Sequence, residues 1–301
     1  MLLRDRARIA VVAPSGVFTA ERLQIAVDAL TAWGFVPVPG PSVTARHRYF
    51  AGTTQQRAED LTWALTADDI DAVWFARGGY GTAQLLDRLP WNELDRRPVI
   101  GFSDATALHA ALANRDRLSI HGPVLHGLTD FDLGTDPPAT PIDTESRNVL
   151  RRLLRTGEAP HLPGRHLCGP HGPVEGRVVG GNLTVLASLV GTPWALDTRG
   201  AIVVLEDVRE HPYRLERALC QLLDSGGLRG AAGVALGDFS HCRPDPGYTL
   251  GDVFKEQLEP LGIPVIFGLP VGHGHHNYAF PHGARGKLDA EGVTFHPAKP
   301  G

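Results

Sequence analysis

The sequence predicts an α/β protein made of two domains, and three observations support this prediction. The 301 residues exceed the usual size of one hydrophobic core, so two domains are expected. Short apolar runs alternate with helical patterns in the first half, which is typical of parallel strands joined by right-handed crossovers. Residues 129–164 are rich in Asp, Pro, Thr and Gly, as linkers are. We expect an N-terminal domain over 1–128, a linker over 129–170 and a C-terminal domain over 171–301.

The elements of the N-terminal half follow one another in strand, helix, strand order. The helix expected at 20–33 has apolar residues at helical spacing, including Leu23, Val27 and Leu30, which give it one buried face. A later helix ends before Pro90, because the residue before a proline avoids the helical conformation. In chain order we expect a strand at 8–13, helices at 20–33 and 54–65, a strand at 71–76, a helix ending near 89, a strand at 98–101 and a helix through 113.

The second half contains a further set of strands and helices. The apolar run Ala201-Ile-Val-Val-Leu205 predicts a strand, and Gly180-Gly-Asn-Leu183 is expected to open a helix. A histidine-rich loop follows the strand expected at 264–267. The remaining expected elements are a helix at 213–223, a strand at 232–236 and a β-segment at 286–289.

The composition excludes several classes of protein. Hydrophobic residues make up 43% and charged residues 21%, which is an ordinary globular balance. The formal net charge of -4 and the scattered Lys and Arg argue against nucleic acid as a partner. No apolar run approaches the roughly 20 residues of a membrane span, and no secretion signal is recognised at the N-terminus. Cys168, Cys220 and Cys242 lack CxxC spacing, so we expect a cytoplasmic protein without disulfides or thiolate zinc.

The segment Gly101-Phe-Ser-Asp104 places a serine where an apolar strand turns into a helix, which is the local arrangement of a nucleophile elbow. Ala105 stands where a strict G-x-S-x-G motif has its last glycine. The backbone N–H of Asp104 would lie at the positive end of the next helix, where it could stabilise an oxyanion. The structural alternative is that Ser103 or Asp104 only caps the helix.

The glycine-rich turn Arg77-Gly-Gly-Tyr-Gly81 follows another predicted strand. Its amides should therefore gather at the carboxyl edge of the sheet, where open α/β folds bind ligands. Glycine lets the backbone approach a substrate closely. The turn lacks the G-x-x-x-x-G-K-[ST] pattern and the full G-x-G-x-x-G pattern, so nucleotide binding is the less favoured function. A tight turn without a functional role is the alternative.

Two groups in the second half supply titratable side chains. Leu205-Glu-Asp207 ends an apolar strand with two carboxylates, which could orient a histidine, bind a metal or be a solvated strand end. Gly272-His-Gly-His-His-Asn277 carries three histidines in a glycine-flanked loop, and histidine is the usual general base near neutral pH. The rival interpretation is a metal site formed by these histidines with Glu206 or Asp207, although H-x-H-H is not the helical H-x-x-x-H spacing.

Taken in order, these motifs resemble the LD-carboxypeptidase family, which includes murein tetrapeptide carboxypeptidases and microcin-immunity peptidases. The resemblance runs from about Ile9 to Leu288 and includes Gly180-Gly-Asn-Leu183. It implies an N-terminal parallel-sheet domain resembling class I glutamine amidotransferases and a smaller C-terminal α/β domain, with the active site in the cleft between them. Family members commonly form homodimers, so a homodimer is expected.

The resemblance also implies a serine-type catalytic triad. Ser103 would be the nucleophile, His273 the general base and Glu206 the carboxylate that supports the base. The oxyanion hole would use the backbone N–H groups of Asp104 and Gly79. No metal and no cofactor is expected.

Further residues are expected to contact the substrate. Arg77, Gly78 and Tyr80 belong to the glycine-rich turn, and Arg77 is the candidate that binds a free carboxylate of the substrate, with a structural ion pair as its alternative. His275 and His276 lie outside the shared motif and are the other candidate substrate contacts.

The implied reaction is cleavage of the amide between an L-configured centre and a terminal D-amino acid, as in release of D-alanine from murein tetrapeptide during cell-wall recycling. The alternative within the family is cleavage of aminoacyl-nucleotide-like compounds, for which an aromatic stacking residue in the connecting segment would help. Residues 129–164 contain Phe131 but no Trp or Tyr, which favours the muropeptide. A metal-dependent hydrolase and a non-catalytic protein that binds ligands in the same cleft are the alternatives from other classes.

Overall fold

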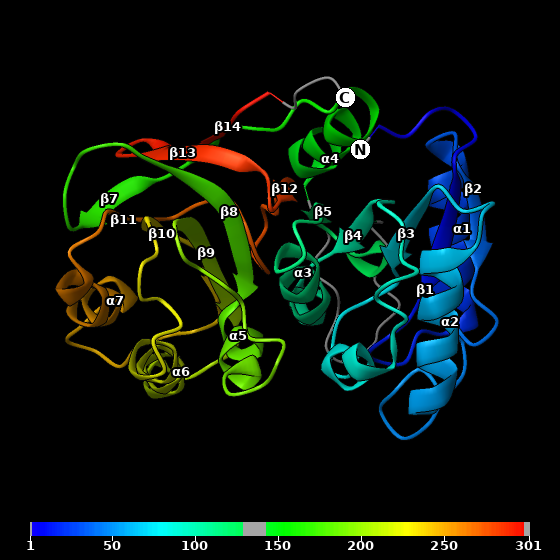
Figure 1. The fold of residues 1–301 in the computed structure, drawn as a ribbon, viewed down its shortest axis with the longest axis horizontal. Helices are drawn as coiled ribbons and strands as arrows, with labels where there is room; N and C mark the ends of the chain where they lie inside the picture. The colour runs from blue at the N-terminus through cyan, green and yellow to red at the C-terminus, as the bar shows by residue number, and fades with distance from the viewer. Residues whose placement is uncertain (1, 129–142, 298–301) are drawn as a thin grey trace.

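The computed structural model describes residues 2–128 and 143–297 and contains two β-sheets with helices packed against them (Figure 1). The first sheet has six strands, in the spatial order β12 (Phe280–His282), β5 (Ser119–His121), β4 (Val99–Gly101), β3 (Ala72–Phe75), β1 (Arg8–Val12) and β2 (Val36–Pro39). Strands β1 to β5 pair in parallel, and β12 pairs antiparallel with β5. The parallel pairing predicted from the strand, helix, strand order is therefore confirmed.

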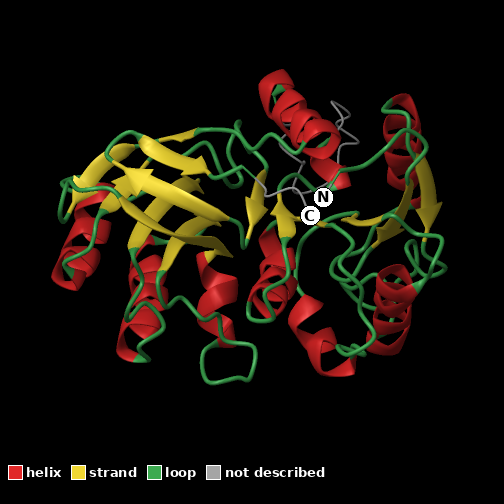
Figure 2. Ribbon diagram, turned by 45° about the horizontal axis from the view of Figure 1, so that its top comes forward, coloured by secondary structure: helices red, strands yellow, loops and turns green. Residues whose placement is uncertain are grey.

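The second sheet has eight strands and is mixed. In spatial order they are β6 (Leu162–Pro163), β14 (Gly292–Phe295), β13 (Arg285–Asp289), β8 (Val174–Asn182), β9 (Ala201–Val208), β10 (Gly233–Ser240), β11 (Val265–Phe267) and β7 (Arg165–Cys168). The four strands from β8 to β11 are parallel, and the flanking strands pair antiparallel. Figure 2 shows helices gathered on one face of this sheet.

Most of the α-helices begin at side chains that accept hydrogen bonds from free backbone N–H groups. Thr53 and Gln56 form a capping box before one helix, and Asp143 caps another by accepting from the N–H of Ser146. The α-helices are α1 (Ala20–Ala32), α2 (Thr54–Thr66), α3 (Thr106–Ala113), α4 (Thr144–Thr156), α5 (Leu183–Leu189), α6 (Pro212–Asp224) and α7 (Leu250–Leu258). Short 3₁₀ helices are η1 (Thr82–Arg88), η2 (Ser103–Ala105), η3 (Leu125–Gly127) and η4 (Glu259–Leu261).

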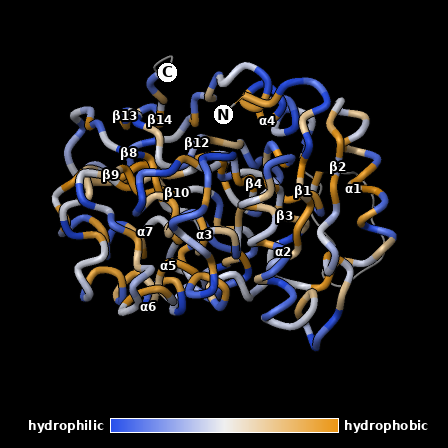
Figure 3. The backbone as a smooth tube through the Cα atoms, turned by 45° about the vertical axis from the view of Figure 1, so that its right-hand side comes forward, coloured by the Kyte–Doolittle hydropathy of each residue, from blue (hydrophilic) through white to orange (hydrophobic). Residues whose placement is uncertain are grey.

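The first sheet buries both of its faces, because alternate residues of a strand point to opposite sides. On β1, Ala10 and Val12 belong to a core cluster that includes residues of α2. Ile9 and Val11 belong to a second cluster with residues of α1 and α4. Figure 3 shows α1 changing between hydrophilic and hydrophobic along its length, as expected for a helix with one buried face.

One hydrophobic core connects the two sheets. The cluster that contains Val12 and Phe75 of the first sheet also contains Val203 and Leu205 of the second sheet. Helices α3 and α5 contact each other, and α3 also contacts β8. The two halves of the chain therefore share apolar packing, which holds the carboxyl ends of their strands in a defined relation.

One predicted helix takes a different form. The segment between Gly81 and Pro90 is the 3₁₀ helix η1 and not an α-helix. Pro90 has no N–H to donate to the carbonyl of Leu86, and the indole of Trp91 donates to that carbonyl instead, at 2.7 Å. The helix therefore lies where it was predicted and ends before Pro90, but it is a 3₁₀ helix.

The segment expected to be a linker contains regular structure where it is described. Residues 129–142 lie outside the described residues, and so does Phe131. The rest of the range 129–170 contains helix α4 and strands β6 and β7, which pair with β14 and β11. Among the described residues, no helix is long and apolar enough to cross a membrane.

Candidate active site

Ser103 lies at the turn between β4 and α3, where the sequence predicts a nucleophile elbow. Its φ angle is 61°, in the left-handed region that residues with a Cβ atom rarely adopt. Gly101 allows this turn to close, since a Cβ there would come within 2.9 Å of the Cβ of Ala105. The methyl group of Ala105 is accommodated, although a strict elbow motif has glycine at this position. Backbone strain of this kind is typical of functional sites.

The glycine-rich turn lies directly against Ser103. A Cβ on Gly78 would be 2.9 Å from the Oγ of Ser103, so only glycine allows this approach. Gly79 has a φ of 123°, which also favours glycine. The buried carboxylate of Asp104 accepts from the Oγ of Ser15 at 2.5 Å and from the N–H of Thr82 at 2.8 Å. Asp104 therefore connects the serine turn to η1, the segment that follows the glycine-rich turn.

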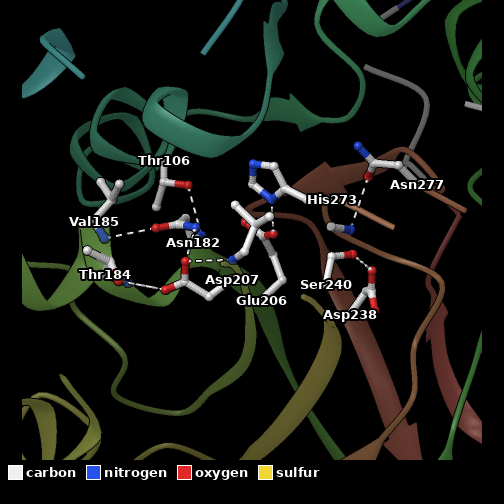
Figure 4. A network of polar contacts seen from close by, with 12 residues as sticks. Thr106, Asn182, Thr184, Val185, Glu206, Asp207, Asp238, Ser240, His273 and Asn277 are labelled. Atoms are coloured by element: carbon white, nitrogen blue, oxygen red, sulfur yellow. Dashed lines mark hydrogen bonds and ion pairs between the residues drawn. The ribbon is translucent and has the colours of Figure 1, made fainter. Parts of the chain in front are cut away.

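His273 and Glu206 form a close pair from the second half of the chain (Figure 4). The Nδ1 atom of His273 is 2.6 Å from Oε2 of Glu206, whose side chain is fully buried at the end of β9. Burial alone would lower the pKa of His273, but the Glu206 carboxylate outweighs burial and holds that pKa above its ordinary value. Asp207 and Asp238 contribute in the same direction. A carboxylate on Nδ1 leaves Nε2 of the ring to act as a base.

Asp207, next to Glu206, has a structural role. Its carboxylate accepts from the Nδ2 of Asn182 at 3.0 Å and from the N–H and Oγ1 of Thr184 at 2.9 and 2.7 Å (Figure 4). The N–H of Asn182 donates in turn to Oγ1 of Thr106, at 3.0 Å, on the helix that follows Ser103. The Gly180-Gly-Asn-Leu183 motif thus joins the strand that bears Glu206 to the helix that follows the serine.

The histidine loop is fastened to α4. The N–H of Asn277 donates to Oγ of Ser146 at 3.0 Å, and Ser146 donates to the carboxylate of Asp143 at 2.7 Å. The Nδ1 atom of His276 lies 2.9 Å from the same carboxylate. His275 is joined to Asp143 through its carbonyl, which accepts from the backbone N–H. These contacts anchor the loop that carries His273.

Ser103 and His273 line the same cavity of about 240 Å³. The ring of Phe102, beside the serine, packs on the ring of His273 with centroids 4.6 Å apart. The cavity is lined by Arg77, Gly78, Gly79, Phe102, Ser103, Pro123, Val124, His126, Gly127, Val208, Arg209, His241, Gly272, His273, Gly274 and Asn277. A serine, an imidazole and a buried carboxylate at such a site are suited to acyl transfer.

Some of the expected substrate contacts do not line this cavity. Tyr80 is 53% exposed, and its ring contacts Phe50. His275 and His276 lie on the anchored side of their loop and are absent from the cavity lining within the described residues. The expected contacts Arg77 and Gly78 do line it, and so does Gly79, which is expected in the oxyanion hole.

His126 lines the cavity beside Arg77, and no motif pointed to it. Its Nδ1 atom lies 2.8 Å from Nη1 of Arg22, whose side chain is mostly buried. Burial and then the positive charges of Arg22 and Arg77 lower the pKa of His126 to about 3. Arg77 donates from Nη1 to the carbonyl of Val17 at 2.9 Å. The guanidinium of Arg77 therefore makes one wall of the cavity suitable for an anion, whereas the ring of His126 is uncharged at neutral pH.

Three further histidines are fully buried between the sheets. His109 contacts the carbonyl of Gly101 at 2.8 Å and the hydroxyl of Ser119 at 2.7 Å, and the Nε2 of His282 accepts from the N–H of Gly180 at 2.9 Å. Burial lowers the pKa of His109 to about 4 and that of His121 and His282 well below the ordinary value. Within residues 2–128 and 143–297, no group of three or more His, Cys, Asp or Glu side chains is arranged to hold a metal ion.

The buried histidines predict a loss of stability in mild acid. Below about pH 6.5 the unfolded chain binds protons at these histidines, whereas the folded chain does not. Each should therefore reduce the free energy of unfolding by about 1.4 kcal/mol per pH unit as the pH falls from 6.5 to 5. The test is to measure the free energy of unfolding by urea for wild type and His109→Gln between pH 6.5 and 5. The slope of this free energy against pH should be smaller in the variant by the contribution of one histidine. An unchanged slope would contradict the prediction.

The two halves of the chain match the two domains of one known family. Residues 9–122 match the LD-carboxypeptidase N-terminal domain, and residues 175–288 match the LD-carboxypeptidase C-terminal domain. The first range contains Ser103 and the second contains Glu206 and His273.

Individual relatives share this likeness over nearly their whole length. The murein tetrapeptide carboxypeptidase of Pseudomonas aeruginosa is 40% identical over 291 residues, which cover 94% of this chain and 93% of that protein. The crystal structure of muramoyltetrapeptide carboxypeptidase from Oxalobacter formigenes superposes with a TM-score of 0.83 at 32% identity, covering 95% of this chain and 97% of the other. The microcin C7 self-immunity protein MccF, in complex with aspartyl sulfamoyl adenosine, has the same fold, with a TM-score of 0.84 at 23% identity and coverage of 99% and 98%.

Proposed function

The chain belongs to the LD-carboxypeptidase family, and from that premise we propose that it is a serine carboxypeptidase that releases terminal D-alanine from a murein tetrapeptide. The observation that supports this most is the left-handed Ser103 on a cavity that His273 also lines, with His273 held by the buried Glu206. A structural serine has no need of a strained backbone or of a place on a cavity that a carboxylate-supported imidazole also lines.

In the proposed mechanism, Nε2 of His273 takes the proton of Ser103, and the serine oxygen attacks the carbon of the scissile amide. The oxyanion receives hydrogen bonds from the backbone N–H groups of Gly79 and Asp104. Glu206 stabilises the imidazolium, which then protonates the leaving amine and frees D-alanine. Water activated by His273 hydrolyses the acyl ester and restores Ser103.

An exopeptidase must also bind the free carboxylate at the end of its substrate. Arg77 is the proposed binding group, because it lines the cavity and a guanidinium forms charge-assisted hydrogen bonds with carboxylates. Among the described residues, no acidic side chain forms an ion pair with Arg77, so its charge is available to a ligand.

The alternative substrate is an aminoacyl-nucleotide-like compound, which the MccF structure named above contains. A purine base would gain from an aromatic ring on which to stack. Of the described residues that line the cavity, the one Phe, Tyr or Trp is Phe102, and its ring already packs on His273. This arrangement favours the peptide substrate.

Purified protein is expected to release D-alanine from a murein tetrapeptide faster than it cleaves an all-L tetrapeptide or an aminoacyl sulfamoyl adenosine. The reason is that Arg77 is available to bind a carboxylate, whereas no described lining residue has an aromatic ring free for stacking. Initial rates for the three compounds, followed by chromatography of the products, test the proposal. Faster cleavage of the adenosine compound would assign this chain the alternative substrate, and no turnover of any compound would favour a binding protein.

A further inference from the structure

Two glycines flank His273, so the local backbone alone does not fix this residue. Gly272 and Gly274 stand on either side of it, and glycine has more conformational freedom than any other residue. Gly272 has a φ of 127°, in a region that favours glycine. A general base must nevertheless be held in one place, because a misplacement of about 1 Å can cost about 100-fold in rate. Contacts beyond the two glycines must therefore hold His273.

Gly272 lies directly against Glu206, the carboxylate that supports His273. A Cβ at Gly272 would be 2.9 Å from Oε2 of Glu206, the same oxygen that lies 2.6 Å from Nδ1 of His273. This Cβ would also be 3.2 Å from the carbonyl oxygen of Asp238, so Gly272 packs against both β9 and β10. A shift of Gly272 would therefore change how the imidazole meets its carboxylate.

The side chain of Asn277 holds Gly272 from the other end of the histidine loop. Its Oδ1 atom accepts a hydrogen bond from the N–H of Gly272 at 3.3 Å (Figure 4). A backbone bond closes the loop beside it, since the N–H of Tyr278 donates to the carbonyl of Pro270 at 2.7 Å. Of these two bonds, the one made by the Asn277 side chain is the one adjacent to His273.

Asn277 is itself held in place by α4. It is 1% exposed, and its N–H donates to Oγ of Ser146 at 3.0 Å. Ser146 donates in turn to the carboxylate of Asp143, the residue that caps this helix. Asn277 thus connects a capped helix to the glycine that precedes His273.

Only the oxygen of the Asn277 amide is used in this contact. Within the described residues, Oδ1 has a partner and the buried Nδ2 has none. A side chain that keeps an oxygen at this place, such as that of aspartate, should therefore keep the bond to Gly272. Leucine, of similar size, would leave the N–H of Gly272 without its acceptor.

We propose that Asn277 is a positioning residue for the general base, whose side-chain oxygen fixes Gly272 and thereby holds His273 against Glu206. This inference rests on the proposed function, in which His273 is the base. It adds a residue that acts through the backbone of the loop and not through the reacting atoms.

The groups that face His273 make its position measurable. Burial lowers its pKa, but Glu206 and, to a smaller extent, Asp207 and Asp238 raise it above its ordinary value. His121 interacts with the ring from β5, and burial keeps His121 neutral. The charged or titratable residues on the cavity side are Arg77, His126, Arg209 and His241. Because Glu206 contributes most to raising the pKa of His273, a ring that moves away from Glu206 should have a lower pKa.

Two substitutions of Asn277 test the inference. Asn277→Leu is expected to lower kcat by about 100-fold, as for a misplaced catalytic group. In this variant the pKa of His273, followed by NMR, should fall, and the acid limb of the pH dependence of kcat/KM should move to lower pH. Asn277→Asp keeps an oxygen toward Gly272, so its kcat should stay within about tenfold of wild type and the pKa of His273 should not fall.

Asn114→Leu and Asn114→Asp are the matched controls. Asn114 also accepts from a backbone N–H through Oδ1, that of Asp197 at 2.9 Å, and it is not among the described residues that line the cavity. Both variants should keep the kcat of wild type and the pKa of His273. Asn277→Ala removes the same acceptor as Asn277→Leu without its bulk, and it takes the place of that variant if the thermal midpoint shows that leucine prevents folding.

Labelling of Ser103 by a fluorophosphonate separates this inference from the proposed function, because labelling requires the base but no peptide. If wild type releases no D-alanine, but Asn277→Leu is labelled about 100-fold more slowly and Asn277→Asp is not, the proposed function fails and the positioning role is supported. The positioning role is overturned if folded Asn277→Leu keeps either the labelling rate or the His273 pKa of wild type, whether or not D-alanine is released. It is also overturned if folded Asn277→Asp loses as much labelling rate as Asn277→Leu.

Discussion

Replacement of Ser103 by alanine is expected to lower kcat by about 10⁶-fold, the loss typical for removal of a triad nucleophile. Without the hydroxyl, no acyl ester forms, and only water in the cavity can attack the amide. The fold should survive, because the change removes one oxygen atom and the turn still has Gly78 and Gly101 at its close approaches. The measurements are turnover of the murein tetrapeptide and the thermal midpoint of both proteins.

Covalent labelling gives a second readout for Ser103. A fluorophosphonate should modify wild type at this residue and leave Ser103→Ala unlabelled, and mass spectrometry of the labelled peptide identifies the site. Activity of the variant within about tenfold of wild type, or a label on another residue, would remove Ser103 as the nucleophile. If Ser103→Ala has the same thermal midpoint as wild type, unfolding is excluded as the cause of its lost activity.

Glu206→Gln is expected to lower kcat by about 10⁴-fold while keeping the size of the side chain. Glutamine cannot stabilise the imidazolium, and its amide can present an N–H to Nδ1 of His273, which favours the wrong tautomer. The Glu206 carboxylate is also the group that contributes most to raising the pKa of His273 against burial. The acid limb of the pH dependence of kcat/KM should therefore move to lower pH in the variant.

The matched control for Glu206→Gln is Asp207→Asn, the same change at the next buried carboxylate. Asp207 bonds Asn182 and Thr184, so its replacement should reduce the free energy of unfolding by about 1–3 kcal/mol. In Asp207→Asn the acid limb of the pH dependence of kcat/KM should move to lower pH by less than in Glu206→Gln, because Asp207 contributes less to raising the pKa of His273. If the acid limb of kcat/KM lies at the same pH in wild type and Glu206→Gln, the group that titrates there is not His273.

The sequence was a good guide where apolar residues form a helical pattern or a continuous run. The helix α1 was expected because its apolar residues repeat at helical spacing, and the strands β1, β3 and β9 were expected because each is a short apolar run. Other short strands lack such a run. Prolines interrupt β2, and β5 and β12 have three residues each, so these were found only in the structure.

Site residues that belong to sequence motifs could be predicted, whereas site residues outside any motif could not. The segments around Ser103, Glu206 and His273 carry glycines and carboxylates that indicate a turn or a strand end. His126 has no such surroundings, and only the folding of the chain around one cavity places it in the same lining as Ser103. Arg209 follows the Leu205-Glu-Asp207 strand end, but that motif does not indicate that Arg209 lines the cavity. A positive φ at a non-glycine residue, as at Arg209, is likewise invisible in the sequence.

Strand β12 has a consequence for the order in which this protein becomes active. The sheet that carries Ser103 is complete only when Phe280–His282 pairs with β5, and these residues follow the histidine loop in the chain. During synthesis the chain as far as His282 must leave the ribosome before that pairing forms, so the edge of β5 is exposed until then. Such distant pairing slows folding, and a nascent chain that still lacks β12 is vulnerable to aggregation. The serine turn thus reaches its final surroundings only after the histidine loop has been made, so the hydrolase matures as one unit.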